Sequence, residues 1–236
     1  MIKIENVEVV GYAPAIRGAR NPMNSWDKSD SAWGTEARAY GNKVFVVGDN
    51  DLALMSKLAN AGDDHGKAIR YLDVYLDIEA PLYFWKEFKT YRTGRNFLDE
   101  ENDYDYDDDA ILENYIETNS CSTMHKIHTK EFTVDDFSHE HLDHFGMRLL
   151  ENTINILNRN RELFLETKDK KYWWQMIQLL PNSYHQRRTV KLNYQVLRNM
   201  YKRRKNHKLD CWKEFCLWIE TLPYSELITG EKNNGE

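Results

Sequence analysis

A chain of 236 residues with 41% hydrophobic and 13% aromatic side chains can bury a substantial core, which excludes a disordered protein. No apolar run approaches the ~18 residues of a transmembrane helix, the N-terminus lacks the apolar segment of a signal peptide, and the three cysteines form no C-x-x-C pair. With a formal net charge of −6, we expect a soluble, cytoplasmic protein whose thiols are reduced.

The charges are unevenly distributed along the chain. Nine acidic residues fall within residues 99–113, and nine lysines or arginines fall within residues 187–208. A basic block of this density needs an anionic partner. Three partners are open at this point: a nucleotide phosphate, a nucleic acid, or the acidic segment of this chain or of a neighbouring subunit.

The first third of the chain predicts strands, a loop and a helix. Apolar residues alternate over residues 2–10, which is typical of a strand. Residues 16–43 are rich in Gly, Asn, Ser and Asp and predict a long loop of the kind that is usually functional or mobile. A short strand over residues 43–47 follows, and Asp49 or Asn50 then caps a helix.

The middle of the chain contains the clearest strand, over residues 71–78, where apolar and polar side chains alternate without a break. Ala80-Pro81 then opens a helix that ends near Tyr91-Arg92, because proline is favoured in a first helical turn. The acidic segment, residues 96–116, reads as an insertion.

The last part of the chain is predicted to be mainly helical. Ser138 caps a long helix, a second helix runs from about Thr189 to Arg204, and an aromatic helix ends at Leu222-Pro223. Neither a repeat nor a linker divides the sequence. We therefore predict one α+β domain over residues 1–236.

Two polar constellations stand out. From Asn193, the offsets to Leu197, Asn199 and Arg204 allow one flank of a helix to carry the leucine inward while the polar side chains line a pocket. His65 lies in a donor-rich turn just before the clearest strand, where it could hold a phosphate or a flavin edge. The alternative for His65 is a solvent-exposed turn histidine.

The order of these motifs resembles the flavin-dependent thymidylate synthases. That family carries a Gly-His turn, a strand, Ala-Pro and a helix that ends in Arg-His-Arg, and later Leu-Pro, a Tyr, a Thr, Asn-x-Arg-x-Leu and a closing Arg. The matching positions here are His65, strand 71–78, Ala80-Pro81, Arg92, Leu180-Pro181, Tyr184, Thr189, Asn193, Leu197 and Arg204.

The resemblance implies a fold and an activity. The expected fold is that of the thymidylate synthase-complementing proteins, an α+β fold with a twisted, mostly antiparallel sheet flanked by long helices, in a homotetramer with sites between subunits. The implied reaction is the reductive methylation of dUMP with FAD, NADPH and methylenetetrahydrofolate. Arg204 would polarise the uracil ring and bind substrate.

The resemblance also implies the binding residues. His65, Asn193 and Asn199 would contact the flavin, Arg92 would hold flavin or nucleotide, and Asn119 and Ser122 would bind the nucleotide.

Several family arginines are replaced in this chain. Thr90, Met124, Ile177 and Gln195 stand at family Arg positions, and Glu87 replaces a Gln. A phosphate of charge near −2 is normally held by arginines or backbone N–H groups, so the substitutions remove much of the expected grip. Basic residues that could substitute are Lys67, Arg70, Lys89, Lys126, Arg187, Arg188 and Arg203.

The substitutions leave three functions open. The chain is an active enzyme, a catalytically inactive module that captures or senses a nucleotide, or an assembly protein with an empty cleft. Its Lys- and Asn-rich composition resembles that of phage proteins.

Metal and nucleic-acid sites are not expected. Asp103, Asp105 and Asp107 alternate like a calcium loop, but the sixth position is Asp108 rather than Gly. His141 and His144 share a helix face without the further ligands of a zinc site. The basic residues near the C-terminal helix lie on several faces and accompany no nucleic-acid-binding signature.

Overall fold

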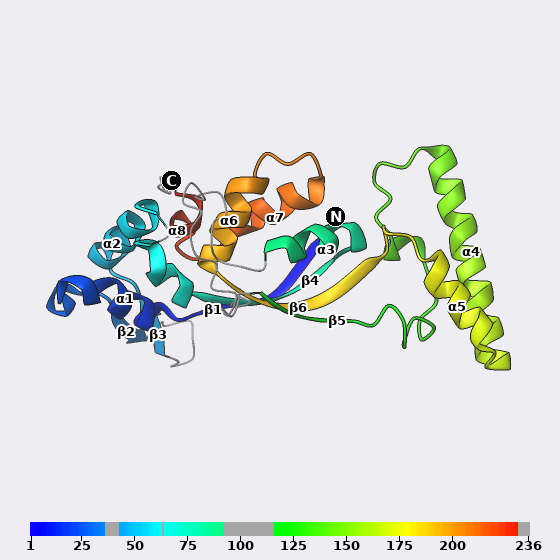
Figure 1. Cartoon of the computed structure of the whole chain (residues 1–236), viewed down its shortest axis with the longest axis horizontal. Coiled ribbons are helices and arrows are strands. Elements are labelled where there is room, and N and C mark those ends of the chain that lie inside the picture. Colours follow the sequence, from blue (N-terminus) through cyan, green and yellow to red (C-terminus); the bar gives the residue numbers. More distant parts are fainter. Residues whose placement is uncertain (36–42, 63, 92–115, 231–236) are drawn as a thin grey trace, which may run out of the picture. The chain divides into compact units, whose positions relative to one another are not determined.

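The computed structural model describes residues 1–35, 43–62, 64–91 and 116–230 of the chain (Figure 1). It has an α+β fold with antiparallel sheets and helices, as predicted. The order of the four-stranded sheet is β1-β4-β6-β5, and β2 and β3 form a separate antiparallel hairpin in which Trp33 is paired with Phe45. No helix of the described residues is long and apolar enough to cross a membrane.

The strands are β1 (Lys3–Val10), β2 (Ala32–Thr35), β3 (Lys43–Val46), β4 (Asp73–Pro81), β5 (Glu117–Ser120) and β6 (His185–Asn193). The α-helices are α1 (Tyr12–Arg20), α2 (Asp49–Asn60), α3 (Leu82–Phe88), α4 (His144–Thr167), α5 (Lys170–Leu179), α6 (Tyr194–Arg204), α7 (Asp210–Glu220) and α8 (Glu226–Thr229). The 3-10 turns are η1 (Asn21–Met23), η2 (Trp26–Lys28), η3 (Gly66–Tyr71), η4 (Lys89–Tyr91) and η5 (Val134–Asp136).

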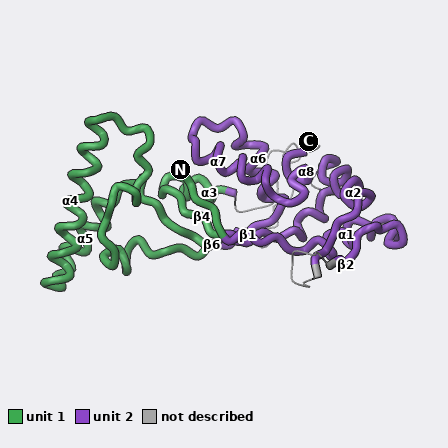
Figure 2. Tube along the Cα trace, turned by 180° about the vertical axis from the view of Figure 1, so that it is seen from behind, with its two compact units in different colours: residues 1–5, 77–90, 118–189 green, residues 6–76, 91–117, 190–236 purple. Residues whose placement is uncertain are grey.

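The chain divides into two compact units (Figure 2). Unit 1 consists of residues 1–5, 77–90 and 118–189, and unit 2 consists of residues 6–76, 91–117 and 190–236. The strands β1, β4 and β6 each continue from one unit into the other. The prediction of one domain over the whole chain stays a prediction.

Unit 1 is built around the helical hairpin of α4 and α5, which pack against each other. Their inner faces share a core cluster of Ile127, Phe132, Phe137, Leu150, Ile154, Leu157 and Met176. The predicted start of this hairpin was wrong: α4 begins at His144, where the Asp143 carboxylate accepts a hydrogen bond from the Gly146 N–H at 2.8 Å. Ser138 instead donates to Glu140.

Unit 2 is a helical body in which η3 packs against α1, α2 and α6. Its part of β4 follows the predicted alternation, because Val74 and Leu76 are buried whereas Tyr75 is exposed. The predicted helix from Thr189 was wrong over its first part: β6 continues to Asn193 and α6 begins at Tyr194. The buried positions of β6 alternate, and this period of two is that of a strand.

The predicted loop over residues 16–43 was also wrong in its first part. Helix α1 continues to Arg20 and buries Ala15, Ile16 and Ala19, three small or aliphatic side chains on one helix face. The turns η1 and η2 and the strand β2 follow. The composition of this segment is that of a loop, but the spacing of its apolar residues is that of a helix. Of the acidic insertion, residues 96–115 lie outside the described residues.

Candidate functional site

Helix α6 of unit 2, with its N-cap, carries three of the predicted site residues, which are Asn193, Asn199 and Arg204. Asn193 occupies its N-cap, and the Asn193 side-chain oxygen accepts a hydrogen bond from the Val196 N–H at 3.0 Å. Asparagine is a preferred N-cap because its side chain satisfies an N–H group that has no partner within the helix. The Asn193 side chain is therefore committed to starting the helix through its oxygen, and only its amide nitrogen can donate to a ligand.

The turn that carries His65 lies against α6. Gly66 is buried, and a Cβ atom at this position would lie 3.7 Å from the Gln195 Oε1 atom. Gln195 in turn donates from Nε2 to Asn199 Oδ1 at 3.3 Å. His65 is exposed, and its backbone N–H donates to the Gly62 carbonyl at 3.2 Å. The structure therefore places Gly66, which follows His65, against Gln195 of α6, and Gln195 against Asn199, all within unit 2.

Arg204 is the last residue of α6 and is held by aromatic side chains of unit 2. Its Nε donates to Tyr91 Oη at 2.6 Å, and its guanidinium lies 4.8 Å from the centre of the Trp212 ring. The helical rise places Arg204 about 7.5 Å along the axis from Asn199. Arg92, which follows Tyr91 in the chain, lies outside the described residues.

Asn119 and Ser122, two of the predicted nucleotide ligands, lie in unit 1. Asn119 is exposed on β5, and Ser122 follows in a turn where its Oγ accepts from the backbone N–H groups of Met124 and His125, at 3.2 and 2.9 Å. The Ser122 hydroxyl hydrogen can still donate to a ligand. The six predicted residues that are described thus divide between the units: Asn119 and Ser122 in unit 1, and His65, Asn193, Asn199 and Arg204 in unit 2.

The residues of the basic block have different partners. Arg187 forms ion pairs with Glu5 at 3.1 Å and Asp77 at 2.8 Å, on the half-exposed face of β6. Lys191 lies 3.5 Å from Asp73. Arg198 is buried and donates to the Leu227 carbonyl at 2.8 Å and to Asn60 at 2.6 Å, so it joins α6 to α8 and α2.

Arg188 has a different environment from these residues. It is 7% exposed, donates twice to Gln186 Oε1, from Nε at 3.1 Å and from Nη2 at 2.8 Å, and lies over the ring of Trp85 at 4.4 Å. Burial lowers the pKa of Arg188 below its usual range. The sequence placed Arg188 among seven candidate cations and gave no signal that would distinguish it from Arg187.

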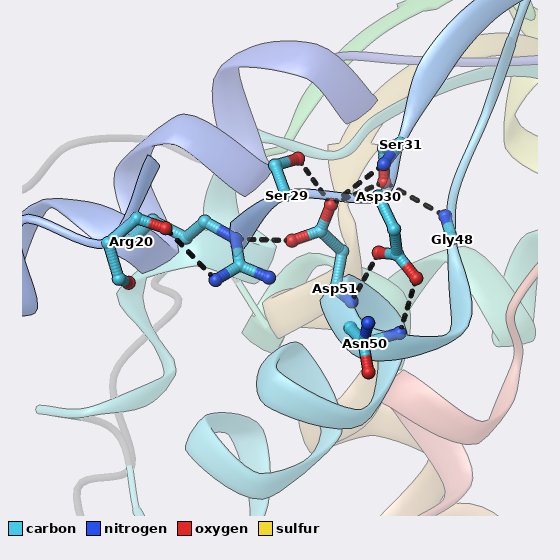
Figure 3. A network of polar contacts seen from close by, with 8 residues as sticks. Arg20, Ser29, Asp30, Ser31, Gly48, Asn50 and Asp51 are labelled. Carbon is cyan, nitrogen blue, oxygen red and sulfur yellow. Dashed lines mark hydrogen bonds and ion pairs between the residues drawn. The ribbon is translucent and has the colours of Figure 1, made fainter. Parts of the chain in front are cut away.

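A second buried charge lies in a polar network that the sequence did not predict (Figure 3). Asp51 is fully buried and accepts from Arg20 Nε at 2.5 Å, from Ser29 Oγ at 2.6 Å and from Ser31 Oγ at 2.6 Å. Burial pushes the pKa of Asp51 upward, but the hydrogen bonds from the two serines and from Arg20, with the Arg20 charge, bring it below its ordinary value.

Asp30 completes this network at the start of α2. Its carboxylate accepts from the backbone N–H groups of Asn50 at 2.8 Å and Asp51 at 3.1 Å, which have no partner within the helix (Figure 3). The network joins α1, the segment around Ser29 and α2. Arg20 and Asp51 are hydrogen-bonded to each other, and Asp30 accepts from backbone N–H groups, so each charged group has a partner within the network. We assign the network a structural role.

The described residues contain no group of three or more His, Cys, Asp or Glu side chains that could hold a metal ion. The aspartates of the calcium-like repeat lie outside the described residues.

Solved structures of flavin-dependent thymidylate synthases share this fold. Two are structures of the flavin-dependent thymidylate synthase ThyX from Helicobacter pylori, both with FAD and dUMP. Each is 14% identical to this chain; one has a TM-score of 0.62 and covers 96% of this chain and 99% of its own, and the other has a TM-score of 0.64 and covers 98% of each. Neither a protein-family model nor a curated protein sequence matches the chain.

Proposed function

We propose that this chain binds FAD and a uridine nucleotide and carries out the reductive methylation of dUMP. The observation that supports this most is the position of the His65–Gly66 turn beside Gln195 and Asn199 of α6. Gly66, the residue after His65, therefore lies against one of the two hydrogen-bonded amide side chains of α6, and the resemblance implies that His65 and Asn199 contact the flavin. The ThyX structures of the same fold hold FAD and dUMP.

The chemistry of these residues fits a flavin. The ring system and pyrophosphate of FAD offer mainly hydrogen-bond acceptors, and His65, Asn193, Asn199 and Arg204 all carry nitrogen donors. The bound flavin, with NADPH and methylenetetrahydrofolate as co-substrates, supplies the methylene and hydride chemistry. Arg204 is proposed to stabilise the negative charge that develops on the uracil ring, and its bond to Tyr91 fixes the orientation of the guanidinium.

The nucleotide is proposed to contact Asn119 and Ser122 of unit 1. A homotetramer in which neighbouring subunits complete each site is part of the proposal through the resemblance alone. Arg92 belongs to the proposed site through the resemblance alone.

A second function is favoured by the environment of Gln195. Gln195 stands at a family Arg position, is 2% exposed, and donates to Asn199. An uncharged amide thus stands among the proposed site residues of α6 where the family has an arginine. The loss of this positive charge would weaken phosphate binding. On this reading the chain captures or senses a nucleotide without turning it over.

Two measurements on the purified chain separate these functions. The visible absorbance spectrum during titration with FAD reports flavin binding, and chromatography of a reaction with dUMP, NADPH and methylenetetrahydrofolate reports dTMP. Flavin binding with dTMP formation supports the enzyme. Binding of dUMP without dTMP supports the capture module, and binding of neither FAD nor dUMP contradicts both functions.

A further inference from the structure

Arg188 is a buried cation without an anionic partner among the described residues. Charged side chains are seldom buried to this extent unless a carboxylate or a ligand compensates them. The two bonds of Arg188 go to one neutral oxygen, Oε1 of Gln186, and its charge lies over the face of Trp85. Burial lowers its pKa, and no carboxylate of the described residues offsets this effect.

The guanidinium of Arg188 has a nitrogen left for a ligand. Nη1 donates to none of the described residues, and it does not belong to the few unpartnered polar atoms that are sealed from solvent. Nη1 is therefore not completely sealed from solvent. Because the guanidinium is planar and its N–H groups form a fixed fork, it suits the oxygens of a phosphate better than a point charge would.

The surroundings of Arg188 hold it in one orientation. Trp85, which lies under the guanidinium, donates from its indole nitrogen to the Gln186 carbonyl at 2.9 Å and the Ala80 carbonyl at 3.1 Å. Gln186 accepts from Arg188 and donates from Nε2 to the Cys121 carbonyl at 2.6 Å. A ligand that binds here would meet a cation whose side chain is already ordered.

Hydrogen bonds through Gln186 connect Arg188 to the segment that carries the predicted nucleotide ligand Ser122. Gln186 joins Arg188 to Cys121, the residue before Ser122, and the Cys121 N–H donates to the Arg187 carbonyl at 3.0 Å. The hydroxyl of Ser122 is a further donor on this segment. Arg188, Gln186, Cys121 and Ser122 all belong to unit 1, so this arrangement does not depend on how the two units are placed.

We propose that Arg188 is the cation that binds a phosphomonoester dianion in unit 1, with Ser122 as a hydroxyl donor. Arg188 thereby replaces the phosphate contacts of family arginines, because Met124, Ile177 and Gln195 stand at those arginine positions in this chain. We infer the anion site from the contacts of Arg188. Only the identity of the nucleoside rests on the proposed function.

The test compares Arg188→Met with Arg187→Met by isothermal titration calorimetry. The two arginines are adjacent in β6, but Arg187 lies on the opposite face and is paired with Glu5 and Asp77. Arg188→Met should weaken dUMP binding about tenfold to a hundredfold, the loss expected for a charge-assisted hydrogen bond. Arg187→Met should bind dUMP within about twofold of the wild type. Equal affinities of wild type and Arg188→Met would overturn the proposal.

Two further titrants separate the phosphate from the nucleoside. Inorganic phosphate at constant ionic strength should bind the wild type and lose its binding in Arg188→Met, whereas deoxyuridine should not distinguish the two proteins. If phosphate depends on Arg188 while dUMP binds no more tightly than phosphate, the anion site stands and the proposed function fails. If deoxyuridine is affected as strongly as dUMP, the phosphate is not what Arg188 binds.

A measurement on the wild-type protein covers the case in which Arg188→Met does not fold. The Nε–H resonance of Arg188 can be assigned by NMR through its absence from an Arg188→Lys spectrum. It should shift during a titration with phosphate, and the Nε–H resonance of Arg187 should not. A stationary Arg188 resonance at saturating phosphate would contradict the proposal.

Discussion

At the scale of single residues, the ion pair of Arg20 and Asp51 is buried within unit 2. Both side chains are removed from solvent, at 6% and 0% exposure. Removal of one partner from such a pair leaves the other as an uncompensated buried charge, which commonly costs about 3–5 kcal/mol.

Asp51→Asn should therefore lower the free energy of unfolding by about 3–5 kcal/mol in urea denaturation. Asp49→Asn is the control, because Asp49 is exposed in the same helical turn and its substitution should cost no more than about 1 kcal/mol.

The folded pKa of Asp51 lies below its ordinary value of 3.8. Its stabilising effect is thus complete above that pH and is lost as the pH falls through the folded pKa. In acid the wild type should lose more stability than Asp51→Asn, and identical acid profiles would contradict this account.

Arg204 combines a proposed catalytic role with packing against Tyr91 and Trp212. Arg204→Ala should abolish the thermal stabilisation by dUMP, and it should also lower the free energy of unfolding by about 1–3 kcal/mol because a hydrogen bond and a cation–π contact are lost. Arg203→Ala removes the exposed neighbouring arginine and should keep the response to dUMP. A wild-type thermal shift in Arg204→Ala would show that the site is assigned to the wrong residue.

At the scale of elements, the junction of β6 and α6 positions Asn193 and the other proposed site residues of α6. Asn193→Ala should destabilise the protein by about 0.5–2 kcal/mol, since the N-cap bond to Val196 is lost. Asn193→Ser keeps a capping oxygen and should restore most of this loss. If Asn193→Ser is stable yet binds FAD more weakly, the amide nitrogen contacts the flavin as proposed. An Asn193→Ala variant as stable as the wild type would refute the capping role.

Several elements could be predicted from the sequence because one local signal dominated. The alternation over residues 71–78 predicted β4, and the aromatic spacing before Leu222 predicted α7. The strand β6 could not be predicted in this way. Its buried positions include Gln186 and Arg188, so a hydrophobic pattern of period two is not visible in its first half. The polar residues of α6 suggested one continuous helix instead.

The candidate site, too, could be predicted from the sequence only in part. The sequence predicted that the His65 turn and α6 carry the site, and the structure places them side by side. It could not show that Asn193 caps the helix or that Gln195 bonds Asn199, because these bonds depend on where the helix begins. Nor could it distinguish Arg188 from Arg187, since the two differ in the face of the strand on which they lie.

At the scale of the whole molecule, α4 carries an apolar stripe on its outer side. Phe145, Leu149 and Ile156 are 78%, 68% and 48% exposed, and their spacing places them on one helix face. Exposed apolar patches of this kind commonly mark protein–protein contacts. The stripe supports the proposed homotetramer by offering a surface that a second copy of the chain could cover.

Leu149→Lys should therefore reduce the oligomer to smaller species in sedimentation velocity, because a charge would be buried in the interface. Asn155→Lys introduces the same charge on an exposed position of α4 away from the stripe and should leave the oligomer unchanged. A wild-type chain that sediments as a monomer, or a Leu149→Lys variant of wild-type size, would contradict the proposed assembly.

The central claim is that this chain holds a flavin and a uridine nucleotide together. The most direct measurement is a titration of the purified protein with FAD, followed by visible absorbance, before and after the addition of dUMP. We predict saturable flavin binding and a further change of the flavin spectrum when dUMP is added. A spectrum that stays that of unbound FAD throughout both additions would contradict the claim.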